Sequence, residues 1–189
     1  MPVILVMIAL LLGPIAGYWT AIKAYKRISA RASIGNGPWY ANLAAGSEKV
    51  DPYTRVSVAK NGILALRQSE TIYYSARKDD QGNWLNGDKV YRIEGKKPDA
   101  RWWSITLYGT DHFLIPNELN RYSYNMNNVE YDENGRFSFY VSNTPREGAW
   151  LPLNNNKRFV LTLRLYNPGD SIRNNPAKVE LPHIIAEGE

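Results

Sequence analysis

The sequence predicts a mainly β protein, an antiparallel β-sandwich or barrel with one N-terminal transmembrane helix and one helix before the sheet. Some eight short segments alternate apolar and polar residues with a period of two, and turn-forming residues separate them. The composition agrees, because 13 Tyr and 6 Trp favour strands over helices. At 189 residues, the chain has room for one domain of ordinary size after its apolar start.

The most aromatic stretch, Arg101–Tyr124, is predicted to form a strand–turn–strand unit around which the sheet is organised. Its first strand has two faces, since neighbouring side chains on a strand point in opposite directions. One face carries Trp103, Ile105 and Leu107, and the other carries Trp102, Ser104, Thr106 and Tyr108. Gly109–Asp111 turns the chain into the short apolar run Phe113–Ile115, which Pro116 ends.

The N-terminal segment is expected to be an uncleaved membrane anchor. No charged side chain occurs from Met1 to Ile22, and a helix over these residues spans roughly 30 Å, the thickness of a bilayer core. Tyr18 and Trp19 lie where an aromatic belt is expected, and basic residues follow from Lys23 onward. A cleaved signal peptide is the alternative, although the segment lacks a basic start and a small-x-small cleavage site.

The residues after the anchor are interpreted as a linker followed by a helix. Ser33–Ser47 is rich in Gly, Asn and Ala, which is typical of a linker. Asp51 is expected to cap a helix whose first position is Pro52. Apolar residues keep helical spacing to about Arg67, and Gly62 weakens the middle of this helix.

Further strands are predicted on both sides of the central unit. They are centred on Ile72–Ala76, Trp84–Leu85, Lys89–Ile93, Val129–Tyr131, Phe137–Val141, Arg158–Tyr166 and Val179–Ile185. Asp132–Gly135 predicts a hairpin between two of them, and Pro182 indicates that the last strand lies at a sheet edge.

Several kinds of chemistry are disfavoured by the composition. The chain has no Cys, which excludes a thiolate site, and its two His, His112 and His183, are far apart, so we expect neither a metal site nor a cofactor. No nucleophile elbow and no phosphate-binding Gly loop occur. The net charge of +5 lies partly beside the apolar segment, where it suits lipid headgroups better than nucleic acid.

The candidate ligand-binding residues are three arginines and the polar and aromatic residues near the central turn. They are Arg101, Trp102, Tyr108, Asp111, His112, Arg121, Tyr122 and Arg164. Arg164 interrupts an apolar strand, so its guanidinium needs either a carboxylate partner or an anionic ligand. We expect Arg101 to lie near it and the aromatic rings to form a stacking platform, although simple core and rim packing would also explain those rings.

Catalytic residues are not identified; Glu118, Glu130 and Asp132 are further carboxylates for two-carboxylate hydrolysis.

Four motifs in this order resemble the domain-of-unknown-function family numbered 1214. They are DPYTR, RWWSITLYGTDHFLIPNELNRYS, AWLP and FVLTLRLYNP, and the resemblance runs from about Pro38 to the C-terminus. It implies a jelly-roll-like sandwich and no catalytic residues. The anchor-plus-domain layout resembles small bacterial members, in which basic residues before the membrane helix place the domain outside the cytoplasm. This chain has no such residues.

The predicted organisation is therefore an anchor at residues 1–27, a linker at 28–50 and a β-sandwich domain at 51–189. The leading function is a membrane-anchored envelope protein that binds a glycan, an anionic small molecule or a partner protein. The alternatives are an envelope enzyme acting on a glycan and an accessory subunit of a membrane complex. The positive-inside rule favours a cytoplasmic domain, whereas the family layout favours a periplasmic one, which we expect.

Overall fold

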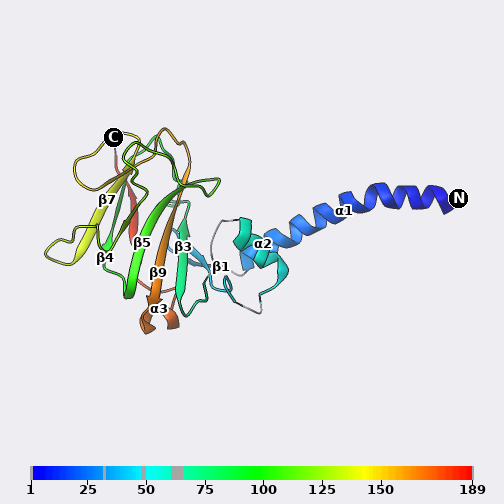
Figure 1. The fold of residues 1–189 in the computed structure, drawn as a ribbon, viewed down its shortest axis with the longest axis horizontal. Helices are drawn as coiled ribbons and strands as arrows, with labels where there is room; N and C mark the ends of the chain where they lie inside the picture. Colours follow the sequence, from blue (N-terminus) through cyan, green and yellow to red (C-terminus); the bar gives the residue numbers. More distant parts are fainter. Residues whose placement is uncertain (1, 32, 48–49, 61–65, 189) are drawn as a thin grey trace.

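The computed structural model describes residues 2–31, 33–47, 50–60 and 66–188, and it contains two packed β-sheets with an N-terminal helix that extends away from them (Figure 1). The six-stranded sheet has the order β1 (Ser33–Asn36), β2 (Trp39–Asn42), β3 (Thr71–Ala76), β9 (Phe159–Pro168), β5 (Ala100–Gly109) and β6 (Ser123–Asn125). The four-stranded sheet has the order β10 (His183–Ala186), β4 (Tyr91–Lys96), β7 (Arg136–Ser142) and β8 (Trp150–Pro152). The mainly β, sandwich-like prediction is confirmed, and the jelly-roll connectivity stays a prediction.

The two long strands β5 and β9 pair at the middle of the six-stranded sheet. Their antiparallel register places Ile105 opposite Leu163 and Trp103 opposite Leu165. All four of these side chains are fully buried, because the period of two turns every second residue toward the other sheet. The side chains that alternate along the sequence of each strand therefore point alternately into the core and to the outer face of the sheet.

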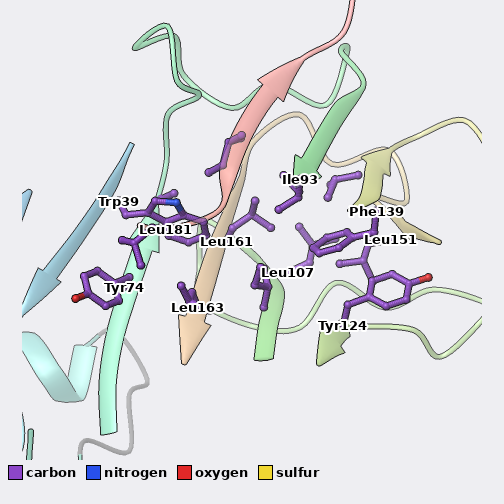
Figure 2. Close-up of a cluster of buried hydrophobic side chains, with 14 of the residues drawn as sticks. Trp39, Tyr74, Ile93, Leu107, Tyr124, Phe139, Leu151, Leu161, Leu163 and Leu181 are labelled. Carbon is purple, nitrogen blue, oxygen red and sulfur yellow. The ribbon is translucent and has the colours of Figure 1, made fainter. Parts of the chain in front are cut away.

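Aromatic and aliphatic side chains from both sheets fill the space between them (Figure 2). Trp103 of β5 stacks on Phe137 of β7 with 4.6 Å between ring centroids, and Tyr124 of β6 lies 4.8 Å from Phe139. The polar ends of two core residues bind the C-terminal segment: Trp39 Nε1 donates to the carbonyl of Pro182 at 2.6 Å, and the Tyr74 hydroxyl donates to that of Pro176 at 2.8 Å. These bonds satisfy groups that would be costly to bury alone.

The segment 28–50, predicted as a linker, contributes two strands to the larger sheet. β2 pairs with β3 through Trp39 opposite Ala76, and β1 pairs with β2. Trp39 is only 1% exposed. Gly and Asn residues made this stretch resemble a linker, but burying the indole against the core stabilises the extended pairing.

The predicted helix at 51–67 is shorter in the structure. α2 spans Pro52–Lys60, the residues 61–65 of the prediction lie outside the described residues, and Leu66 and Arg67 are not helical. The predicted cap is confirmed, because Asp51 Oδ1 accepts from the backbone N–H groups of Tyr53 and Thr54 at 2.9 and 3.1 Å. The Thr54 hydroxyl and these N–H groups lower the pKa of Asp51.

Two predicted pairings are reduced to isolated bridges. The turn at Asp132–Gly135 forms, since the Asp132 N–H donates to the Arg136 carbonyl at 2.8 Å, and one bridge, Tyr131 to Phe137, follows it. The turn before Phe113–Ile115 also forms, with the Gly109 N–H donating to the Phe113 carbonyl at 2.9 Å and one bridge from Leu114 to Tyr108. The predicted strand Phe137–Val141 is confirmed as β7, which pairs with β4 and, in parallel, with β8. The predicted edge strand near the C-terminus is confirmed as β10 at the edge of the four-stranded sheet.

The N-terminal helix α1, Pro2–Arg31, is long and apolar enough to cross a membrane from Val3 to Ile28. Its apolar side chains are exposed, and it projects from the sandwich beside α2 and β1 (Figure 1). A short α3, Asp170–Asn174, follows β9 and buries Ile172. By length and composition α1 fits a membrane anchor or a signal sequence.

Replacing Trp39 with Ala is expected to destabilise the protein by roughly 3–5 kcal/mol, because it empties a buried indole site and removes the bond to Pro182. The measurement is urea unfolding followed by fluorescence. Trp84→Ala is the matched control, since Trp84 is 53% exposed, and its effect should be about 1 kcal/mol or less. Equal effects of the two substitutions would show that β2 is not part of the core.

The free energy of unfolding is expected to fall as the pH rises above about 10. Burial raises the pKa of Tyr74 and of Tyr91 above the ordinary value of 10.0, so the unfolded chain releases these protons first. Their contribution is complete below that pH and is lost as the pH rises through the folded values. Tyr74→Phe should flatten this decline and lower stability at neutral pH by about 1 kcal/mol, through loss of the bond to Pro176. Unfolding titrations at several alkaline pH values test both effects.

Candidate functional site

The outer face of the six-stranded sheet carries arginine, hydroxyl and aromatic side chains but no carboxylate. The outward positions of its central strands are Thr71, Tyr73 and Ser75 of β3, Val160, Thr162, Arg164 and Tyr166 of β9, and Trp102, Ser104, Thr106 and Tyr108 of β5. The outward residues of β2 and β6 are Tyr40, Asn42, Ser123 and Asn125, so all five strands lack an outward Asp or Glu. We call this surface the arginine face.

Arg164 lies at the middle of the arginine face, between Tyr73 of β3 and Ser104 of β5. Its Nη2 donates to the Tyr108 hydroxyl at 2.7 Å and its Nη1 donates to the Thr106 hydroxyl at 3.1 Å. The guanidinium carbon lies 5.4 Å from the centroid of the Tyr108 ring. Among the described residues, no carboxylate forms an ion pair with Arg164. Its side chain is partly exposed, so the cation is held by neutral hydroxyls at an accessible surface.

The arginine face has small side chains close to the sheet and larger side chains that extend above them. Ser104, Thr106 and Thr162 point outward, yet each is less than a tenth exposed. Arg164 leans over the sheet to donate to the Thr106 hydroxyl and so helps to cover it. At the far end, the Trp102 ring meets Tyr166 edge to face at 5.3 Å. These three hydroxyls are therefore mostly buried, and the partly exposed groups are Arg164, Trp102, Tyr108 and Tyr166.

A second arginine lies toward the other end of the arginine face. Arg77 directly follows β3, at the outward position after Ser75, and its Nη2 lies 3.4 Å from His112 Nε2. The Arg77 Nε is buried and has no hydrogen-bond partner among the described residues. Burial raises the pKa of Tyr40 nearby, and the Arg77 charge and a hydrogen bond with Ser75 partly offset this rise. Tyr40 therefore keeps its proton at neutral pH.

The turn after β5 positions His112 against Arg77. Asp111 Oδ1 accepts from the backbone N–H of Phe113 at 3.1 Å, and His112 has a left-handed φ of 68°. Gly109 allows this turn because a Cβ there would lie 2.6 Å from Asp111 Oδ1. Asp111 therefore shapes the backbone, and His112 is the part of the predicted turn that reaches the arginine face.

The outer face of the four-stranded sheet differs, because its two arginines have carboxylate partners. Arg92 forms ion pairs with Glu94 and Glu187, and Arg136 lies 3.9 Å from Glu94. A hollow of about 440 Å³ opens there. Its acidic lining residues are Glu94, Glu130, Asp132 and Glu147. Glu94 is ion-paired and Asp132 Oδ1 accepts from two turn N–H groups, so structural contacts already engage two of the four.

The eight sequence-predicted site residues are divided among several places. Tyr108 and Arg164 are in contact, and Trp102 lies on the same arginine face. His112 contacts Arg77 at the end of this face. Arg101 does not lie beside Arg164, because it alternates with Trp102 and therefore belongs to the opposite side of β5.

Arg121 and Tyr122 lie away from the arginine face, beyond β5. Arg121 Nη1 donates to the Trp150 carbonyl at 3.2 Å and lies 3.4 Å from the Tyr124 hydroxyl, which connects the β6 end of one sheet to β8 of the other. The Tyr122 hydroxyl donates to Asn120 Oδ1. The contacts of Arg121 are those of a residue that ties the sheets together.

Sequence reasoning missed Arg77, Tyr40, Tyr73 and Ser75 as members of the same surface. The signal for Arg77 was available, because it continues the outward series of Tyr73 and Ser75 with a period of two. Its proximity to His112 could not be read from the sequence, since the two residues are 35 positions apart. No group of three or more His, Asp or Glu residues suited to a metal ion occurs within the described parts of the chain.

Two solved structures resemble this chain. The VPA0106 protein from Vibrio parahaemolyticus is 27% identical, with a TM-score of 0.57, over 66% of this chain and 33% of that protein. An uncharacterized protein from Burkholderia cenocepacia is 17% identical, with a TM-score of 0.44, over 62% of this chain and 29% of that protein. The chain thus spans about a third of the length of these proteins. No curated protein sequence matches it closely enough to be counted as similar.

A family model described as "Protein of unknown function (DUF1214)" matches residues 70–170. This range is more than half of the chain and runs from β3 to the end of β9, so it includes Arg77, Tyr108 and Arg164 of the arginine face. The resemblance read from the motifs is confirmed: the chain belongs to the DUF1214 family.

Proposed function

We propose that this protein is a membrane-anchored binding protein of the cell envelope, and that its arginine face binds an anionic ligand at Arg164. The observation that carries the proposal is the environment of this cation, which two hydroxyls hold and which no carboxylate among the described residues neutralises. The arginines on the opposite outer face, Arg92 and Arg136, have carboxylate partners. Arg164 therefore differs from these two arginines, because it has no carboxylate partner among the described residues.

An anion gains more from Arg164 than a neutral molecule does. A guanidinium has five N–H donors, and the bonds to Thr106 and Tyr108 involve one each from Nη1 and Nη2. A carboxylate or phosphate that accepts hydrogen bonds from the remaining N–H groups of Arg164 forms charge-assisted bonds, which are about twice as strong as neutral ones. The two existing bonds also orient the guanidinium, so less side-chain freedom is lost on binding.

The rest of the arginine face favours an acidic glycan among anionic ligands. The partly exposed side chains of Tyr40, Ser75 and Tyr108 supply hydroxyl groups on this face. Trp102 and Tyr166 present rings suited to stacking on the flat face of a sugar. A protein partner would use the same cation for an acidic side chain, and the binding assay below distinguishes these cases by the ligand that is retained.

The location in the envelope rests on α1. Its exposed apolar length, the aromatic pair Tyr18 and Trp19, and the basic residues that follow fit a single-pass anchor in contact with lipid. We infer a periplasmic domain from the layout of small family members, against the charge rule, which favours the cytoplasm. An envelope enzyme and an accessory subunit of a membrane complex are the two alternative functions, and one observation favours each.

Glu130 and Glu147 line the hollow on the four-stranded side, which favours an enzyme acting on a glycan. Gly13 and Gly17 of α1 have open space around them, which favours helix packing in a membrane complex.

Arg164→Leu is expected to weaken binding of galacturonate roughly tenfold or more, because the charge-assisted bonds are lost. Titration calorimetry on the full chain in non-ionic detergent measures this, with galactose as the neutral probe that lacks the carboxylate. Arg101→Leu makes the same change of charge on the other side of β5 and should bind as the wild type does. Unchanged affinity in the folded Arg164 variant would disprove this proposal, and equal losses in both variants would indicate a general charge effect.

An introduced cysteine tests the anchor and its orientation. The chain has no Cys, so Asn134→Cys in an exposed turn provides a single thiol. We expect a membrane-impermeant maleimide to label it in intact cells whose outer membrane is permeabilised, and we expect the isolated protein to keep α1. Labelling only after lysis would place the domain in the cytoplasm, and a mature protein that begins near Arg31 would show that α1 is a cleaved signal.

A further inference from the structure

We propose that Arg77 is a second cationic arm of the Arg164 site and that the ligand carries two separate negative groups, as in an acidic disaccharide unit. This inference rests on the proposed function, because it names the class of ligand that the same surface binds. It replaces the sequence-based pairing of Arg164 with Arg101, which lies on the other side of β5. Three observations on Arg77 support it.

The first observation is position. Tyr73 lies opposite Arg164 in the sheet, and Arg77 follows four residues later on the neighbouring strand, on the same outer face. With about 3.4 Å per residue and about 4.8 Å between strands, the two Cα atoms are roughly 14 Å apart. Arg164 also reaches toward Arg77, since its partner Tyr108 lies farther along β5 than Ser104, its neighbour in the sheet. The two guanidinium groups thus approach each other across one surface.

The second observation is the charge environment of Arg77. Its Nη2 contacts the imidazole of His112 at 3.4 Å, and its Nε is buried without an acceptor among the described residues. No ion pair joins Arg77 to a carboxylate in the described parts of the chain. A buried guanidinium donor without a partner is costly, and an anion bound at the exposed end of the group would offset the uncompensated charge.

The third observation is the surface between the arginines. Ser75 of β3 and Thr162 of β9 are opposite each other and lie between Arg77 and Arg164 along the strands. The hydroxyl of Tyr40 adds a third polar group beside Ser75. Ser75 and Tyr40 are partly exposed, so a ligand that spans the two cations meets hydrogen-bonding groups between them. Two guanidinium groups on one surface suit a ligand that brings a negative group to each of them.

The test compares galacturonate, which has one carboxylate, with digalacturonate, which has one on each of two linked rings. The full chain in non-ionic detergent should bind digalacturonate roughly tenfold more tightly or better. Arg77→Leu should remove this preference and leave galacturonate affinity within about twofold, whereas Arg164→Leu should weaken both. Lys78→Leu is the matched control: it changes the charge equally at the next residue, and its ammonium lies 5.4 Å from the Trp84 ring.

The outcomes separate this inference from the proposed function. If the wild type binds both probes equally and Arg77→Leu behaves like it, the second arm is refuted while the Arg164 site stands. If the wild type binds neither probe, the proposed function fails as well. If Lys78→Leu lost the preference for digalacturonate as fully as Arg77→Leu does, the inference would also be overturned. The preference would then depend on the net positive charge of the region and not on a contact with Arg77. Arg77→Gln, which keeps a polar side chain, replaces Arg77→Leu if that variant does not fold, and is judged by the same criteria.

Discussion

The pairing of β5 with β9 is the interaction on which the rest of the structure depends. It runs from Ala100 opposite Pro168 to Gly109 opposite Phe159, and β3 and β6 add to its two sides. Its register determines both faces at once, because a slip by one residue would exchange every inward and outward side chain. The inward set closes the core against β4 and β7, and the outward set includes Arg164, Thr106 and Tyr108. The core and the candidate site are therefore two consequences of one alignment.

Polar bonds from core aromatic residues hold distant parts of the chain to this centre. Trp39 and Tyr74 point into the core and donate to carbonyls of Pro182 and Pro176, close to the C-terminus. An indole N–H or a phenol buried in an apolar interior needs an acceptor, and a proline carbonyl supplies one without a competing N–H on the same residue. The N-terminal strands and the C-terminal strand β10 are thus fixed by the same kind of contact. This explains why a stretch as rich in Gly and Asn as 33–47 is ordered.

The two outer faces of the sandwich handle charge in opposite ways. On the four-stranded sheet, Glu94 lies between Arg92 and Arg136, so the charges cancel locally. On the six-stranded sheet, Arg164 and Arg77 contact neutral hydroxyl and imidazole groups. Ion pairs at a surface contribute little to stability, so neither arrangement is required by the fold. Arg164 and Arg77 share one face, and neither has a carboxylate partner among the described residues; the proposed binding role rests on this feature.

The sequence by itself determined the mainly β class, the apolar N-terminal helix, the Asp51 cap and the two faces of β5 and β9, because each follows from local periodicity or capping. It also singled out Arg164, because a charged side chain within an otherwise apolar strand can be recognised from the sequence. Only the tertiary structure decided the partners of these elements. Residues 33–42 became strands because Trp39 is buried by distant residues, and β7, which follows the turn at Asp132–Gly135, found its main partners in β4 and β8. Arg77 and Tyr40 joined the arginine face, and Arg101 left it, for the same reason: strand register and loop contacts bring together residues whose separation along the chain carries no signal.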